Sequence, residues 1–242
     1  MQHSFNFPEN ESAGVIFAAD QAYSLDDSTI EWLGEAMGPF QFPEGPYAGL
    51  IFNNNVSLRR RLLRELDLSC IQMLYFYNPF EVLFNNLLED LGQLERAVLD
   101  CVPDDEDCAL ISSLHGLRAV NLTESNISDE GLKMLCELQS LESLVVSYTS
   151  ITDAGLDNLA RLIDLRELDL SLTMITDQGL GKLSSLKTLE ELRLASTGLS
   201  DDGIGHLLSL HKLKFLDLSE TAVSEEGMAV LQAGLASCQL VY

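Results

Sequence analysis

The chain has few basic residues and lacks the short motifs that mark common enzyme sites. It contains 14 Lys and Arg residues against 38 Asp and Glu residues, for a formal net charge of −24. An acidic surface repels phosphate backbones and anionic membranes, so we expect no nucleic acid and no membrane among its partners. No G-x-S-x-G, H-E-x-x-H, G-x-x-x-x-G-K-[S/T] or G-x-G-x-x-G phrase occurs, and we therefore predict a non-enzymatic protein without a cofactor.

Histidine and cysteine do not occur at the spacings that hold a metal ion. No two of the four histidines are related as i, i+4, none has a cysteine at ligand spacing, and no C-x-x-C pair exists. The acidic run Asp104–Asp107 lacks the alternating ligand order of a calcium loop. We interpret it as a solvated segment that also caps the helix after it, and we predict no metal site.

Long apolar runs are absent as well, and this bears on location. No segment approaches the roughly 20 apolar residues of a membrane span, and the N-terminus shows neither the basic nor the apolar region of a secretory signal. The five cysteines are an odd number, and we expect Cys70, Cys136 and Cys238 to be buried, reduced thiols. The sequence thus favours a reducing cytoplasm, with a bridge between Cys101 and Cys108 as the alternative.

What the chain has instead is a repeat of 24 residues that runs from Leu117 to the C-terminus. Each unit opens with an L-x-x-L-x-L phrase, in which Val120 and Val146 replace single leucines, and continues with Ser or Thr, an aliphatic residue, Ser or Thr, Asp or Glu, and a Gly next but one. Self-similarity at a fixed period of this length indicates a solenoid of stacked units. The opening leucines are Leu117, Leu141, Leu165, Leu189 and Leu213, and the glycines are Gly131, Gly155, Gly179, Gly203 and Gly227.

Each unit is predicted to be a short strand followed by a helix. The alternation in L-x-x-L-x-L predicts the strand, and apolar residues three or four apart in 151–162 predict the helix. Thr152 or Asp153 is expected to supply the N-cap, and we infer that a close backbone approach requires Gly155 in the first turn. The Ser/Thr row after the strand, for example Thr149, is interpreted as a hydroxyl ladder that satisfies backbone groups of neighbouring coils.

Stacking of these units predicts a curved molecule. Strands lie about 4.8 Å apart and helices about 8–10 Å apart, so the strand side becomes concave and the helices line the convex side. The T-x-[I/L]-[T/S]-D-x-G-L phrase and the leucine pattern resemble the leucine-rich-repeat family, in the type found in ribonuclease-inhibitor-like and cysteine-containing repeats. That family usually carries Asn or Cys where this chain has Thr. The resemblance implies an α/β, right-handed leucine-rich-repeat solenoid (a horseshoe) with a parallel concave sheet and convex helices.

The period continues toward the N-terminus in weaker form, with units that open at Leu94, Ile71 and Tyr47. The last residues of the chain fall in strand register after the final complete unit. We therefore predict one repeat domain over residues 47–242, with eight repeats and a terminal half-repeat.

Residues 1–46 do not fit the period and are predicted to be a non-repeat N-terminal cap. Gly14–Ala18 is predicted to be a strand, and Asp26–Met37 is predicted to be a capped helix. A solenoid needs its first hydrophobic coil covered, so we expect this segment to pack over that coil.

The third, fifth, seventh and eighth positions of each unit are expected to point into the concave face. The N-terminal half presents aromatic and apolar residues there, and the C-terminal half presents charged ones. Exposed aromatic side chains beside charged ones are typical of protein interfaces, the alternative being that the cap or nearby loops cover the aromatic ones. The predicted partner-binding residues are Met73, Tyr75, Tyr77, Val98, Tyr148, Leu172, Glu167, Asp169, Arg193 and Asp217.

These features predict a non-enzymatic protein–protein interaction module that binds a partner on its concave face. The negative charge favours a basic or neutral protein partner, the alternative being that it serves solubility alone. The alternative is a structural, self-assembling repeat protein. It would form a homodimer through Gln239, Leu240 and Tyr242, whose strand is expected to leave an unpaired edge.

Leu168→Ala is expected to lower the free energy of unfolding by roughly 2–5 kcal/mol, because Leu168 is predicted to be buried in a central coil. Glu190→Ala, at the rim of the same sheet, is expected to cost under about 0.5 kcal/mol. Urea denaturation of both variants measures the difference, and equal losses would contradict the assignment of faces.

Overall fold

The computed structural model describes residues 104–242 and, before them, the backbone of a set of strands. These earlier strands are β1 (Ser4–Asn6), β2 (Gly14–Ala19), β3 (Ile30–Glu35), β4 (Pro39–Gln41), β5 (Tyr47–Phe52), β6 (Met73–Tyr77) and β7 (Arg96–Asp100).

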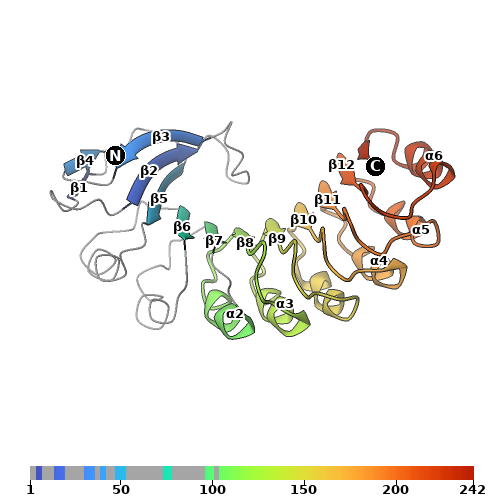
Figure 1. The fold of residues 1–242 in the computed structure, drawn as a ribbon, viewed down its shortest axis with the longest axis horizontal. Helices are drawn as coiled ribbons and strands as arrows, with labels where there is room; N and C mark the ends of the chain where they lie inside the picture. Colours follow the sequence, from blue (N-terminus) through green and yellow to red (C-terminus); the bar gives the residue numbers. More distant parts are fainter. Residues whose placement is uncertain are drawn as a thin grey trace.

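Parallel strands β5 to β13 form the inner face of an arc, which confirms the sheet predicted for residues 47–242 (Figure 1). Tyr75 of β6 pairs with Val98 of β7, and Val98 pairs with Asn121 of β8. The weaker N-terminal period therefore describes the true strand register. The remaining strands are β8 (Ala119–Asn121), β9 (Ser143–Val145), β10 (Glu167–Asp169), β11 (Glu191–Arg193), β12 (Phe215–Asp217) and β13 (Gln239–Val241).

The described helices lie on the outer side of the arc, as the spacing argument predicts (Figure 1). The acidic run before the first of them acts as a cap: Asp104 Oδ1 accepts hydrogen bonds from the backbone N–H groups of Glu106 at 2.9 Å and Asp107 at 3.2 Å. The helices are α2 (Asp105–Ile111), α3 (Asp129–Leu135), the 3₁₀ helix η4 (Gly155–Arg161), α4 (Asp177–Leu183), α5 (Ile204–Leu207) and α6 (Glu225–Gly234).

Within residues 1–46, two described strands extend the sheet at its edge. β2 pairs antiparallel with β5, β3 pairs antiparallel with β2, and β1 and β4 form a separate pair. The strand predicted at Gly14–Ala18 is confirmed. The helix predicted over Asp26–Met37 is wrong, because Ile30–Glu35 is a strand. The β-branched and aromatic residues of β3 favour a strand, its glycine disfavours a helix, and pairing with β2 satisfies its backbone.

One continuous core of aliphatic side chains lies between the strands and the helices of residues 104–242. Leu144, Leu168 and Leu192 from successive strands have no exposed surface, and neither do Leu132 and Leu183 from the helices. Burial of a leucine side chain contributes about 1.5–3 kcal/mol relative to exposure, so this core provides most of the stability of the stack.

The described cysteines belong to this core. Cys136 and Cys238 are buried and free, as predicted, and Cys108 is also free, so it forms no bridge with Cys101. Burial raises the pKa of the Cys108 and Cys136 thiols to about 12, which keeps both protonated and unreactive at neutral pH. Cys70 and Cys101 lie outside the described residues.

Consecutive coils are joined by a carboxylate that serves the helix start of the next coil. Asp177 Oδ1 accepts a hydrogen bond from Ser200 N at 2.9 Å, and Asp177 Oδ2 accepts one from Ser200 Oγ at 2.6 Å. Ser200 Oγ still accepts from Asp202 N at 3.3 Å within its own coil. The same two contacts join Asp105 to Ser128, Asp129 to Thr152, Asp153 to Thr176 and Asp201 to Ser224.

This carboxylate explains the glycine at the start of each helix from α3 to α6. A Cβ at Gly203 would lie closer than 3.0 Å to Asp177 Oδ1, a distance that no side chain adopts. The close approach predicted at Gly155 is confirmed, but the neighbour is the Asp129 side chain rather than backbone. The same restriction applies to Gly131, Gly179 and Gly227.

Four hydroxyls of the Ser/Thr row after the strands donate hydrogen bonds within their own coils, so the predicted contacts to neighbouring coils are wrong for them. The fifth, the buried Ser125 Oγ, has no hydrogen-bond partner among the described residues. Thr149 Oγ1 donates to Val146 O at 2.8 Å, and Thr173, Thr197 and Thr221 repeat this contact. The residue before each hydroxyl has a positive φ, for example Tyr148 at 58°, and this sharp turn brings the hydroxyl back to the carbonyl three residues earlier.

Gly203→Ala is expected to lower the free energy of unfolding by about 1–3 kcal/mol, because the new Cβ displaces the Asp177 carboxylate and leaves Ser200 N–H without its acceptor. Asp177→Ala removes the same contact, so the double variant should cost less than the sum of the two single variants. In the control Gly205→Ala, no atom lies within 4 Å of the new Cβ, and the helix propensity of Ala should stabilise α5 by up to about 1 kcal/mol. Urea denaturation measures all four variants, and additive losses would show that the two residues do not share a contact.

Candidate functional site

Two rows of residues run along the concave sheet at the third and fifth positions of the repeats. The strand register follows the predicted order, with Tyr75 beside Val98 in the fifth row. For Met73, Tyr75, Tyr77 and Val98 the structure describes the strand positions, while their side chains lie outside what is described. The aromatic half of the predicted site therefore stays a prediction.

The charged half of the predicted site lies on β10, β11 and β12, and its side chains are half-buried. Asp169 Oδ1 accepts a hydrogen bond from Ser171 N at 2.9 Å, and Asp217 Oδ1 accepts one from Ser219 N at 2.9 Å. Asn121 makes the same contact with Thr123 N at 3.0 Å. An amide therefore supports this turn as well as a carboxylate does, and the turn does not require the negative charges of the two aspartates.

Arg193 interrupts the acidic surface but is held against the sheet. Its Nη2 donates to Glu191 Oε2 at 2.9 Å, and its guanidinium carbon lies 4.9 Å from the centre of the Phe215 ring. The carboxylate and the ring face both stabilise the cation. On the neighbouring strand, Glu167 Oε2 accepts a hydrogen bond from Ser143 Oγ at 2.8 Å. The surface around Arg193 thus keeps an excess of acidic groups.

The eighth position of the repeat carries the other two predicted residues, Tyr148 and Leu172. Their side chains are 59% and 51% exposed, so both are available to a partner. All five residues of this row have a positive φ, between 53° and 59°. This conformation disfavours every residue with a Cβ except Asn and Asp. The row consists of Glu124, Tyr148, Leu172, Ser196 and Glu220.

Met174 is an exposed residue beside Leu172 that the sequence analysis missed. It is 56% exposed and occupies the tenth position of its repeat, which was not among the positions predicted to face a partner. A comparison of the repeats would have identified it, because no other bulky apolar residue occurs in this row after Leu117. The other residues of the row are Asn126, Ser150, Gly198 and Ala222.

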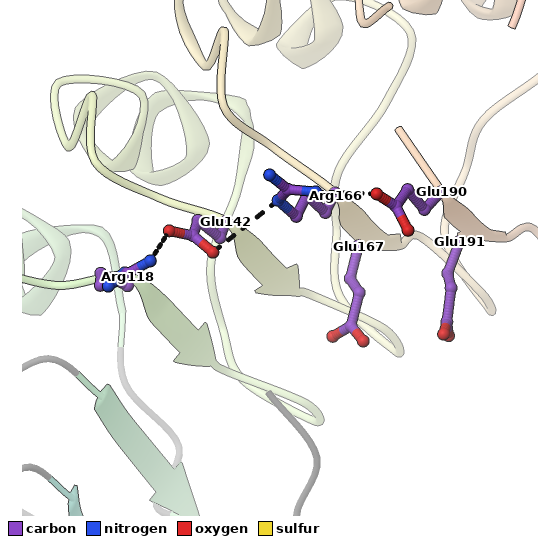
Figure 2. Close-up of a pocket in the computed structure, with 6 residues that line it drawn as sticks. All are labelled: Arg118, Glu142, Arg166, Glu167, Glu190 and Glu191. Atoms are coloured by element: carbon purple, nitrogen blue, oxygen red, sulfur yellow. Dashed lines mark hydrogen bonds and ion pairs between the residues drawn. The ribbon is translucent and has the colours of Figure 1, made fainter. Parts of the chain in front are cut away.

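A ladder of alternating charges crosses the start of the strands (Figure 2). Glu142 forms ion pairs with Arg118 and Arg166, and Glu190 forms ion pairs with Arg166, at 2.8 Å, and with Lys214. The residues occupy the second position of consecutive units, 24 residues apart. Glu190 was predicted to lie at the rim, and the alternation in sign at this position of the repeat is the sequence signal for the ladder.

The ladder borders a shallow groove of about 370 Å³. Glu167 and Glu191 line the groove and point away from the ladder (Figure 2). Both arginines that line the groove contact a ladder glutamate. The chemistry that this arrangement supports is therefore attraction of a positively charged group by the two glutamates.

The ladder also perturbs the titration of Glu190. A hydrogen bond from Lys214 holds the pKa of the Glu190 carboxyl below its ordinary value, helped by the charge of Lys214 and by Arg166, and opposed by burial. The carboxylate form is favoured in the folded chain, so this contribution to stability is present above the ordinary pKa of a glutamate and disappears as the pH falls through the folded-state pKa.

The described residues do not form a metal site. No group of three or more His, Cys, Asp or Glu residues in this part of the chain could hold a metal ion. Separately, none of the described helices has the length and apolar character needed to cross a membrane.

Comparison with known proteins identifies the repeat. Residues 114–136, 137–160, 162–184 and 185–207 match the family model described as Leucine Rich repeat. Among solved structures, internalin C2 from Listeria monocytogenes is similar with a TM-score of 0.57 and 23% sequence identity, over 72% of this chain and 73% of that chain. An internalin, InlF, from the same organism gives a TM-score of 0.44 and 18% identity, over 77% of this chain and 70% of that chain. No curated protein sequence matches the chain.

Glu190→Gln is expected to lower the free energy of unfolding by about 0.5–1 kcal/mol at pH 7, because Glu190 contacts two cations at a partly exposed site. This value replaces the loss of under about 0.5 kcal/mol predicted from the sequence for Glu190→Ala, which took Glu190 to be a rim residue without partners. The difference from wild type should shrink below the ordinary glutamate pKa, near pH 4, as the carboxylate becomes protonated. Urea denaturation between pH 3 and pH 7 measures it. Glu220→Gln is the control, since Glu220 forms no ion pair with the described residues, and a pH-independent loss in Glu190→Gln would argue against the ladder.

Proposed function

Because residues 114–207 are leucine-rich repeats, we propose that this chain is a non-enzymatic module that binds a partner protein on its concave face. Stacked repeats provide an extended concave surface suited to such binding. The observation that carries the proposal is the variation of the fifth row. Its described members change from Asn to Val, Asp, Arg and Asp in successive strands, while the neighbouring core position stays Val or Leu. The scaffold does not require the residues of that row.

The partner in this proposal is a basic or neutral protein. The face presents Glu167, Asp169, Glu191 and Asp217, and the whole chain carries a net charge of −24. Charges of this kind accelerate the approach of a positively charged partner and repel negatively charged ones. The effect is strongest at low ionic strength, since exposed charges are screened beyond about 8–10 Å in salt.

The aromatic half of the predicted site has a separate role in the proposal. Met73, Tyr75 and Val98 stand on β6 and β7 in the rows that continue the charged half, and Tyr77 stands at the end of β6. Aromatic residues at the centre of an interface contribute a large share of binding energy. We assign them the anchoring of the partner on the N-terminal half of this chain's concave face.

A second candidate function is self-assembly through β13. This strand forms one edge of the sheet, and Tyr242 beside it is 75% exposed. An edge strand offers backbone N–H and C=O groups to another strand, including one from a second copy of the chain. Light scattering at increasing concentration tests this candidate, and a monomer at all concentrations would exclude it.

We also propose a reducing compartment, the cytoplasm, as the place of action. The support is the state of the described cysteines, Cys108, Cys136 and Cys238, which are free and buried in the core. Reduced thiols persist in such a compartment, whereas exported proteins commonly use cysteines in disulfides. Mass spectrometry of alkylated thiols from the native source tests the proposal.

A photo-crosslinking residue at Val145, on the concave fifth row, is expected to capture a protein partner in the source cell. The same residue at Ile163, which is 68% exposed in the segment between η4 and β10, is the control and should not capture it. Equal capture at both positions would contradict binding on the concave face.

With the captured partner, Asp169→Asn combined with Asp217→Asn should slow association and flatten its salt dependence while changing dissociation little. Asn121 shows that an amide preserves the turn contact, so the variant changes charge alone. Stopped-flow kinetics at several salt concentrations measure this effect. An unchanged association rate would contradict the electrostatic part of the proposal.

A further inference from the structure

Three exposed apolar side chains gather on two adjacent coils where the chain leaves the sheet. Tyr148, Leu172 and Met174 are 59%, 51% and 56% exposed. Backbone hydrogen bonds hold their coils side by side: Tyr148 N donates to Ser171 O at 2.9 Å, and Met174 N donates to Ile151 O at 2.9 Å. We call Tyr148, Leu172 and Met174 the exit patch.

The repeats themselves show that the scaffold does not need an apolar exit patch. The eighth position holds Glu124, Ser196 and Glu220 in other repeats, with the same positive φ. A bulky side chain gains nothing from this conformation, which favours Gly and Asn. The patch also has no role in the core, since it is more than half exposed. Apolar residues clustered on a surface that is elsewhere polar mark an interaction site.

The charges around the exit patch indicate what it binds. Glu124 and Glu220 occupy the same row on either side of Tyr148 and Leu172, and both are exposed. Asp169 and Asp217 lie on the strands that lead into this row. Each uses Oδ1 for its turn, and Oδ2 accepts no hydrogen bond from the described residues. A partner segment with Lys or Arg beside an apolar side chain complements this surface.

We propose that the exit patch anchors an extended, basic segment of the partner protein, with one bulky apolar side chain of that segment seated on Tyr148, Leu172 and Met174. The inference rests on the concave-face function proposed above and specifies the chemistry of its partner. A second copy of this chain is a poor occupant, because it carries the same net charge of −24 and like charges repel.

The spacing of the coils sets the spacing of residues in the segment. Leu172 and Glu220 are two coils apart, or about 10 Å at about 4.8 Å per strand. An extended chain advances about 3.3 Å per residue. A segment that crosses the coils therefore places a Lys or Arg about three residues from its apolar anchor to reach Glu220 and Asp217.

A phage-displayed library of random linear peptides, selected on the full chain at low salt, tests the inference. Selected peptides should carry a bulky apolar residue with Lys or Arg about three residues away. Fluorescence anisotropy then measures the affinity of these peptides for wild type and variants. No enrichment, or enrichment of acidic or purely apolar peptides, would overturn the inference.

The decisive variant replaces all three patch residues by serine: Tyr148→Ser, Leu172→Ser and Met174→Ser. Serine occupies these positions naturally at Ser196 and Ser150, so the fold should persist, and circular dichroism checks it. The selected peptides should bind this variant at least tenfold more weakly. A control with Ile163→Ser and Val230→Ser, two exposed apolar residues elsewhere, should bind as wild type does.

The outcomes separate this inference from the proposed function. Weaker binding to Asp169→Asn with Asp217→Asn, but not to the serine variant, would refute the exit patch and leave concave-face binding intact. Binding unaffected by either variant would refute both. Self-association of the chain that the serine variant abolishes would assign the patch to a second copy and overturn the inference of a basic segment.

Discussion

Each coil of this solenoid depends on a carboxylate from the coil before it. Asp177 and its equivalents accept one hydrogen bond from a backbone N–H and one from a hydroxyl at the start of the next coil. The contact satisfies a backbone N–H at or just before the helix start, which has no acceptor within that helix. In the last such pair, the hydrogen bonds from Ser224 hold the pKa of Asp201 below its ordinary value. The carboxylate leaves no room for a Cβ in the facing helix turn, and the recurring glycine follows from that.

These aspartate contacts between coils change how the acidity of the chain should be interpreted. Five aspartates of the total act between coils, at Asp105, Asp129, Asp153, Asp177 and Asp201. Two glutamates, Glu142 and Glu190, act within the charge ladder. These groups have structural roles, so net charge alone overstates the charge that faces a partner. The groups that remain, on the concave strands and around the exit patch, are the ones available to the proposed partner.

Strand positions could be predicted from the sequence because the leucines that recur along the chain are the residues that pack in the core. Residues as far from the regular repeats as Tyr75 fall in the predicted register. The prediction failed at Ile30–Glu35, where pairing with β2 decided the structure and no repeat was present to guide it. It also failed for the partners of Thr149 and its equivalents, because the backbone turn that directs these hydroxyls has no signature in their residue type.

The candidate site was predictable in part for a related reason. Tyr148 and Leu172 stood out since the repeat pattern marks which positions leave the sheet. Met174 was missed because the tenth position was not among those expected to face the concave side, although Met174 differs from every equivalent residue in size. In a repeat protein, the residues that depart from their own column carry more information about binding than the residues that conform to it.

The charge ladder gives the molecule a second, longer period. The core and the aspartate contacts recur with every unit, but the ladder alternates in sign through Arg118, Glu142, Arg166, Glu190 and Lys214, so its electrostatic period is two units. Loss of a single unit would preserve the leucine stack and set two like charges side by side, such as Arg118 against Arg166. Loss of two adjacent units would preserve both periods. The ladder therefore favours the gain or loss of repeats two at a time, because only then do opposite charges stay next to each other in this part of the solenoid.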